Sequence, residues 1–359
     1  MKAIRKQPAE SRPSLAQLRA VGKSLRKKCP RSTHAVWEAP SNRPDPLRLL
    51  EQSDQGRIAG LIPIRHGRMV RTPFTFYRGA ALNMAADLAG TPATGLRVQA
   101  CGDCHLYNFG AYATPERRIV FDINDLDETL PAPWEWDVKR LAASFVLASR
   151  ENGFSRGDAN NAALSCVRSY RQRMAEYSDM TILEVWYASI DIERMISGIE
   201  DAETRRRDLR RLAADRASSM SERHFPKIVI RAGQLPTIQD NPPLIYHPRV
   251  REEDSTDVLV RESFADYRKS LPEDRRALFD RFDLADAALK VVGVGSVGTW
   301  CGVVLMAAGN EDHLFLQMKE AGPSVLEAYA AKSIYPNHGQ RVVNGCRLMQ
   351  SASDIFLGW

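Results

Sequence analysis

Apolar residues recur at helical spacing in several stretches of the chain. Between Asp137 and Ser149, and again between Ala163 and Tyr177, they return every three or four positions, which predicts amphipathic helices with one buried stripe. The charged stretch 201–218 also has helical spacing, with arginines on a solvated face. Shorter or less regular patterns predict three further helices, at Leu47–Glu51, Ala80–Leu88 and Glu262–Ala288.

Short apolar runs bounded by turn residues predict strands. Leu96–Ala100 and Ile119–Ile123 are such runs, and the turn at 115–118 leads us to expect that they form one hairpin. Pro73 and Gly79 bracket a stretch that we expect to be an aromatic turn. The tail 290–359 is predicted to be rich in strands, including 303–306 and 314–318, with one helix near 323–332.

The uncharged stretch 291–310 has the length of a membrane helix. Five glycines interrupt it, and its valines, together with Ser296 and Thr299, suit a strand, a loop and a second strand better. We therefore expect no membrane partner. These patterns together predict an α+β protein with three parts: a basic N-terminal arm (1–35), a mostly helical lobe (36–288) and a β-rich lobe (289–359).

The composition is that of an ordinary globular protein. Fifty Lys and Arg against 44 Asp and Glu leave a net charge of +6, and the first 31 residues hold most of the surplus. Without this arm the chain is nearly neutral, so nucleic acid is not the leading partner. The arm lacks the pattern of an export signal, and six cysteines are too few for a disulfide framework. We therefore expect a cytoplasmic protein.

The densest polar cluster follows the first predicted strand. It reads Cys-Gly-Asp-Cys-His-Leu-Tyr-Asn, with Asp103, His105 and Asn108, and the strand after it carries Asp122 and Asp125. An Asp five residues before an Asn, followed by a second Asp after an apolar strand, is the arrangement by which kinases hold a catalytic base and magnesium ligands. Mg²⁺ prefers carboxylate and amide oxygens, so these residue types fit that chemistry.

Three other interpretations use the same residues. Cys101 to His105 is a literal C-x-x-C-H, the signature of c-type haem attachment, which takes place outside the cytosol. A zinc site would need a second pair of ligands that the sequence does not offer. The acidic cluster is also compatible with a plain turn rich in capping carboxylates.

A second constellation lies near residue 290. Gly293, Gly295 and Gly298 satisfy G-x-G-x-x-G, with Ser296 between them, and the later strand 314–318 leads into Lys319. A helix does not follow these glycines, so the context is not that of a dinucleotide-binding fold. A strand, a glycine loop, two strands and a lysine occur in the order by which a protein kinase covers nucleotide phosphates. Glu327, in the predicted helix, is placed to pair with Lys319, whereas Glu320 points to the opposite face.

The strings that carry these residues resemble a known family. They are similar to the bacterial domain of unknown function family 2252, which is grouped with protein-kinase-like and aminoglycoside-phosphotransferase-like folds, from about residue 30 onward. The strings are RTPFTFYRGAA, CGDCHLYNFG, FDINDLDETLPAPWEWDVKRLAAS and KVVGVGSVGT.

The resemblance implies a role for each motif. Asp103 would be the catalytic base, Asn108 and Asp122 magnesium ligands, and Lys319 the phosphate-binding lysine, with the 293–298 loop over the phosphates of ATP. His105 would orient the catalytic loop, and Asp137 resembles the buried Asp that braces it. A helix N-cap is the plainer interpretation of Asp137.

Two departures from a kinase follow from the order of the motifs. The catalytic loop precedes the glycine loop by about 170 residues, which implies a circularly permuted two-lobe kinase-like fold. The chain also stops at Trp359, where the resemblance implies a further strand, a linker and helices, including the connection that binds adenine. We therefore also expect weak or absent nucleotide binding as an alternative to activity.

The expected function is phosphoryl transfer from ATP, with Mg²⁺, to an unidentified hydroxyl of a small molecule or protein. A catalytically inactive nucleotide-binding scaffold and nucleotidyl transfer remain alternatives. Arg78, at the end of the aromatic turn, either contacts phosphate or an acidic substrate or forms a structural ion pair.

Overall fold

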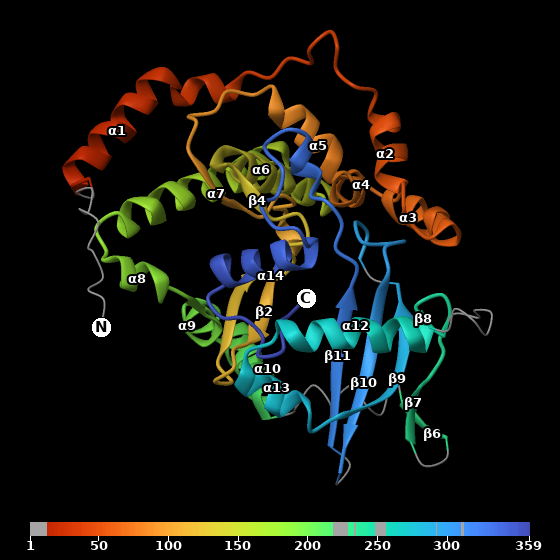
Figure 1. Cartoon of the computed structure of the whole chain (residues 1–359). Coiled ribbons are helices and arrows are strands. Elements are labelled where there is room, and N and C mark those ends of the chain that lie inside the picture. Colours follow the sequence, from red (N-terminus) through yellow and green to blue (C-terminus); the bar gives the residue numbers. More distant parts are fainter. Residues whose placement is uncertain (1–12, 218–228, 233–234, 248–255, 292, 310–311) are drawn as a thin grey trace, which may run out of the picture.

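The computed structural model describes residues 13–217, 229–232, 235–247, 256–291, 293–309 and 312–359. The protein is a mixed α+β structure in which the sheets are small and antiparallel. Figure 1 shows most of the helices on one side of the molecule and the largest sheet, crossed by one long helix, on the other, with a C-terminal helix between them.

Short helices form the first third of the chain. α4 corrects the predicted aromatic turn: Pro73 takes the first helical position and the Thr72 hydroxyl accepts the Thr75 N–H, so the segment begins as a capped helix. The helices are α1 (Leu15–Lys28), α2 (Pro46–Asp54), α3 (Ile62–Met69), α4 (Pro73–Gly79) and α5 (Ala81–Ala89), with 3-10 turns at Arg31–Ala35 and Ala59–Leu61.

The two strands predicted as one hairpin belong to different sheets. β1 (Arg97–Ala100) pairs with β4 (Leu130–Pro133), whereas β3 (Ile119–Ile123) pairs with β2 (Phe109–Ala113) and with β5 (Ile190–Asp191). The prediction of a hairpin at this point was therefore right about β3 and its turn but wrong about its partner. We expected β1 to be the hairpin partner of β3. The partner is instead β2, which begins at Phe109, directly after a 3-10 turn at Leu106–Asn108.

Long helices cover this part of the chain. The predicted helices 137–149 and 163–177 are confirmed within α6 and α7, and 201–217 matches α10, while Ser218 lies outside the described residues. The helices are α6 (Trp134–Glu151), α7 (Arg156–Tyr177), α8 (Ile182–Trp186), α9 (Ile192–Ser197) and α10 (Ala202–Ala217).

The largest described sheet has the order β11-β10-β9-β8, and a separate hairpin joins β6 to β7. Helices α12 and α13 pack on this sheet, where Leu271 and Phe279 meet Val304 and Met306 in one apolar cluster. The elements are β6 (Val229–Ala232), β7 (Leu235–Ile238), β8 (Ile245–Tyr246), α12 (Thr256–Ser270), α13 (Glu273–Phe279), β9 (Asp283–Lys290), β10 (Cys301–Ala308) and β11 (Asp312–Lys319).

The predicted helix 262–288 is wrong beyond Phe279. The alanines of β9 favour a helix, but β9 pairs with β10 along most of its length and with β8 at Leu289 and Lys290, which places them in a sheet. As a result the predicted lobe boundary at 288/289 falls inside β9. No described helix has the length and apolar character needed to cross a membrane.

The last forty residues contain less strand than predicted. The helix expected near 323–332 is a single 3-10 turn, Val325–Ala328, and α14 (His338–Met349) was not predicted. Gly345 of α14 lies so close to Thr129 that a Cβ there would sit 2.2 Å from its methyl group. This close approach brings α14 onto the segment that follows β3.

Candidate functional site

A cavity of about 650 Å³ opens where three distant parts of the chain meet. The first part is residues 52–82, the second is 103–128, and the third comprises the glycine loop and residues 320–328. Nine of the candidate site residues singled out in the sequence line it. They are Arg78, Asp103, His105, Asn108, Asp125, Ser296 and Glu327, together with Gly293 and Gly295 of the loop.

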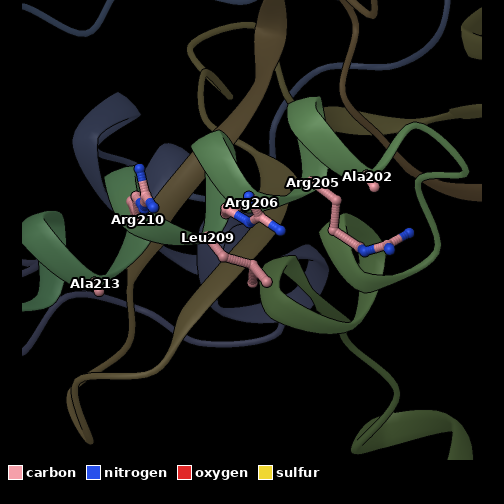
Figure 2. Close-up of a pocket in the computed structure, with 6 residues that line it drawn as sticks. All are labelled: Ala202, Arg205, Arg206, Leu209, Arg210 and Ala213. Carbon is pink, nitrogen blue, oxygen red and sulfur yellow. The ribbon is translucent and has the colours of Figure 1, made fainter.

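A smaller hollow lies on α10, as Figure 2 shows. Its volume is about 430 Å³, and its lining residues are Ala202, Arg205, Arg206, Leu209, Arg210 and Ala213. Arg205 donates to the carbonyl of Ile199 at 2.6 Å, and the described residues that line this hollow include no carboxylate or nucleophile. The candidate catalytic residues therefore belong to the larger cavity.

Asp137 holds the loop that carries Asp103. Its two carboxylate oxygens accept the N–H groups of Cys101 at 2.7 Å and Gly102 at 3.0 Å. Gly102 has φ +85°, and a Cβ there would lie 2.5 Å from the carbonyl oxygen of Glu128, so only glycine fits this turn. Burial raises the pKa of Asp137, and the two backbone donors oppose that shift.

Asp103 forms an ion pair with Arg140, a side chain that is 1% exposed. The Arg140 Nε donates to Asp103 Oδ1 at 2.8 Å, a second guanidinium nitrogen contacts the same oxygen, and that nitrogen also donates to the Tyr77 carbonyl at 3.0 Å. Burial raises the pKa of Asp103 to about 6, and Arg140 limits the rise. A carboxylate with this pKa is ionised at neutral pH and can accept a proton.

His105 lies beside the second oxygen of Asp103. Its Nε2 is 3.7 Å from Asp103 Oδ2, and the ring is buried. Burial, reinforced by Arg140 and Arg78, lowers the pKa of His105 to about 3, so the imidazole is neutral under ordinary conditions. A neutral imidazole is a poor proton donor, and the orienting role expected from the sequence stays a prediction.

Asn108 and Asp125 line the cavity, whereas Asp122 does not. The Asn108 amide donates to the Asp103 carbonyl at 2.7 Å, which leaves its oxygen as a free ligand atom. Asp122 accepts the N–H of Ser351 at 2.7 Å and faces Tyr112 at 3.4 Å. The carboxylate assigned to metal in the sequence is therefore held by the C-terminal segment, outside the cavity.

Lys319 ends β11 next to two carboxylates of the acidic segment. Its Nζ lies 3.3 Å from Asp127 Oδ2 and 3.7 Å from Asp125 Oδ2. Burial alone would lower the pKa of this lysine, but the two carboxylates raise it above its usual value. Burial and Asp125 raise the pKa of Asp127 to about 6. Lys319 is therefore a cation that contacts two carboxylates of the cavity wall, although it is not itself one of the lining residues.

Glu327 does not pair with Lys319. Its Oε1 is 3.9 Å from His338 Nδ1 at the start of α14, and the ion pairs of Lys319 are those with Asp125 and Asp127. The helix that was expected to present Glu327 is only a 3-10 turn, so the side chain stays beside α14. This corrects the expected pair.

Arg341 and Glu128 were missed by the sequence interpretation. The buried guanidinium of Arg341 donates to the carbonyls of Asp127, Thr129 and Gly322, at 2.7 to 2.9 Å. Glu128 accepts the N–H of Val325 at 2.7 Å, and burial raises its pKa to about 7. These contacts join the acidic segment to the wall formed by residues 320–325. In the sequence, the only sign of these contacts was the length of the acidic run from Asp122 to Glu128.

The glycine loop is tied to the N-terminal helices. Arg57 donates to the Val297 carbonyl at 2.6 Å, Arg68 donates to Gly293 at 2.7 Å, and the Ile58 N–H donates to Gly298 at 2.7 Å. Gly293 and Gly298 have φ of +66° and +92°, which favours glycine at both positions.

Gly295 makes the closest approach of the loop to the catalytic segment. A Cβ at this position would lie 3.3 Å from the Arg78 carbonyl oxygen and 4.0 Å from Asp103 Oδ2. The loop backbone therefore borders the candidate base.

Arg78 presents a cation to the cavity. Its guanidinium stacks over the Tyr107 ring at 4.7 Å from the centroid, and its Nε is buried without a hydrogen-bond partner. Arg57 and Arg65, the other lining arginines, hydrogen-bond to backbone carbonyls. Among the described arginines that line the cavity, Arg78 is therefore the one whose guanidinium is available to bind an anion.

A family model described as an uncharacterized protein conserved in bacteria, DUF2252, matches residues 57–359. The chain belongs to this family. No curated protein and no solved structure matches the chain. The part that matches DUF2252 begins at Arg57. It therefore includes every lining residue of the cavity from Arg57 onward, and it excludes α1 and α2.

Proposed function

We propose that this DUF2252 protein transfers the terminal phosphoryl group of ATP to a hydroxyl group. One observation carries the proposal. A glycine loop and an Asp-to-Asn loop followed by acidic residues line one cavity, and a lysine at the end of a strand pairs with two of those acidic residues, although these parts are far apart in the chain. These are the parts that phosphoryl transfer requires, because its catalysis is mainly positioning and charge stabilisation.

Each residue has a defined task in this proposal. Asp103 accepts the proton of the acceptor hydroxyl while that oxygen bonds to the γ-phosphorus, and the bond from the γ-phosphorus to the bridging oxygen breaks to release ADP. Lys319 and Arg78 offset negative charge on the phosphates. Arg140, His105 and Asp137 position Asp103, and the N–H groups of the glycine loop face the phosphates.

The donor set at the cavity fits magnesium. Asn108, Asp125 and Asp127 supply hard oxygen ligands, and no cluster of three acidic, His or Cys residues spaced for a metal occurs in the described part of the chain. Mg²⁺ commonly takes one or two carboxylates and completes its shell with phosphate oxygens and water, so a partial site is what a nucleotide-bound metal needs. When bound, the ion would neutralise charge on the β- and γ-phosphates.

The order of the elements supports a permuted kinase-like arrangement as part of the same proposal. The hairpin β9–β10 carries the glycine loop and β11 carries the lysine, in the sequence order of a kinase upper lobe, but they follow the catalytic loop. The six cysteines are all free thiols, and ATP is a cytoplasmic metabolite, which favours the cytoplasm as the site of action.

A catalytically inactive nucleotide-binding scaffold is the second candidate. The observation that favours it is the internal neutralisation of the site: Lys319 already pairs with Asp127, and Asp103 already pairs with Arg140. Phosphate would have to compete with Asp127 for the lysine.

ATP labelled at the γ- or the α-phosphate distinguishes these functions. The proposal predicts release or transfer of the γ-label with Mg²⁺, and its loss in Asp103→Asn. Transfer of the α-label would indicate nucleotidyl transfer, and binding of ATP without transfer of either label would indicate the scaffold.

A further inference from the structure

Helix α1 is amphipathic and lies largely exposed on the surface of the molecule. At 100° per residue, Leu15, Leu18, Val21 and Leu25 fall within an arc of about 120° on one side of the helix. No side chain of α1 is buried, and Leu15, Leu18 and Val21 are each at least 50% exposed. Figure 1 shows α1 at the periphery of the molecule. Most of its apolar stripe therefore faces solvent, and Leu25 is the member that is partly covered.

Basic residues flank the stripe. On the same helical projection, Arg19 and Arg26 lie along one edge of the apolar arc and Lys28 along the other. The first 31 residues contain ten Lys or Arg and one Glu. An apolar stripe with a strongly basic border is the composition of helices that lie in the interface of an anionic membrane.

A second exposed apolar group lies next to α1. Arg19 forms an ion pair at 2.5 Å with Asp179, which precedes α8 by a few residues. On α8 and at its C-cap, Ile182, Leu183, Trp186 and Tyr187 are between 60% and 78% exposed. Exposed Trp and Tyr suit the boundary between lipid and water, since their rings are amphipathic.

We propose that α1, assisted by α8, docks the protein on the surface of an anionic lipid bilayer without spanning it. The charge complementarity selects lipid, and the apolar stripe distinguishes this partner from nucleic acid, which would use the basic residues alone. α1 lies outside the segment that matches DUF2252, and neither α1 nor α8 supplies a lining residue of the cavity, so this proposal is independent of the catalytic one. It differs from the expectation from the sequence that no membrane is involved.

The test is cosedimentation of the full chain with vesicles of phosphatidylcholine, with and without phosphatidylglycerol. We expect binding to the vesicles that contain phosphatidylglycerol, weakened by added salt. Leu18→Asp and Arg26→Glu should each weaken it roughly tenfold or more, because one removes apolar insertion and the other a contact with the headgroups. Neither position is buried, so thermal unfolding should be unchanged.

Two matched controls lie away from α1. Val70→Asp changes an apolar side chain that is 78% exposed after α3, and Arg275→Glu makes the same charge change on α13. Both should bind vesicles like the wild type. Equal binding with and without phosphatidylglycerol, or α1 variants that bind like the controls, would overturn the proposal. So would tight binding to duplex DNA that Arg26→Glu loses and Leu18→Asp keeps, or a lipid-free dimer that Leu18→Asp dissociates.

Discussion

The Nζ of Lys319 lies 3.3 Å from Asp127 Oδ2, although 192 residues separate the two along the chain. This contact joins the strand after the glycine loop to the acidic segment after β3. Asp125 adds a second carboxylate at 3.7 Å, and Arg341 fixes the backbone of Asp127 from the other side. Both constellations recognised in the sequence contribute lining residues to the cavity, and Lys319 is linked to it through Asp125 and Asp127.

Replacing Lys319 by methionine should lower kcat about 10²- to 10³-fold, because a preorganised cation is lost where charge accumulates on the phosphates. The measurement is steady-state release of γ-phosphate. Lys290→Met is the matched control, since Lys290 is an exposed lysine at the end of β9 and makes no part of the site. Equal rates for Lys319→Met and Lys290→Met would remove Lys319 from the mechanism.

Activity should decline in acid with the titration of Asp103. Because the pKa of this carboxyl is raised to about 6, kcat/KM should fall about tenfold per pH unit below that value. Unfolding does not explain such a loss. Between the ordinary pKa of an aspartate and about 6, the folded protein binds a proton at Asp103 that the unfolded chain does not bind. The contribution of Asp103 to stability therefore increases as the pH falls through this window. An acid limb near pH 4 would contradict this assignment.

Substitution of Arg140 by lysine should move that acid limb upward. Lysine keeps the charge but cannot reproduce the guanidinium contacts with Asp103 and the Tyr77 carbonyl, so burial of Asp103 is less well compensated and its pKa rises further. The pH profile of kcat/KM is the measurement. A profile that keeps its midpoint, with only a lower plateau, would mean that Arg140 supports the fold and does not tune the base.

Gly298→Ala should destabilise the protein by about 1–3 kcal/mol, because the residue has φ +92° and the new methyl group would lie 3.1 Å from Arg57 Cβ. Thermal unfolding measures the effect. Gly67→Ala is the control: it lies within α3 with open space around it, so the alanine should be neutral or stabilising. Similar melting temperatures for the two variants would mean that the loop is not held in this conformation.

Local patterns predicted the elements whose own sequence decides their structure. The apolar stripe of α6 and the glycine loop between two strands were recognised because spacing and glycine content are local properties. β9 was mistaken for helix because Ala285, Ala287 and Ala288 favour helix locally, while pairing with β10 decides otherwise.

The site itself was predicted less completely. Asp122 and Asp125 were equivalent in the sequence, but Asp122 lies within β3 under Ser351, whereas Asp125 follows the strand and lines the cavity. Arg341 could not be found, because its partners are carbonyls that lie far away in the chain. The predicted pair of Glu327 with Lys319 was wrong because the helix expected to carry Glu327 is only a 3-10 turn.

Isothermal titration of MgATP into the wild type, Asp125→Ala and Asp122→Ala tests the central claim most directly. We predict binding to the wild type that requires Mg²⁺, affinity about tenfold or more weaker in Asp125→Ala, and near wild-type affinity in Asp122→Ala, whose carboxylate lies outside the cavity. The absence of Mg²⁺-dependent binding to the wild type, or titrations of Asp125→Ala that match the wild type, would contradict a nucleotide site at this cavity.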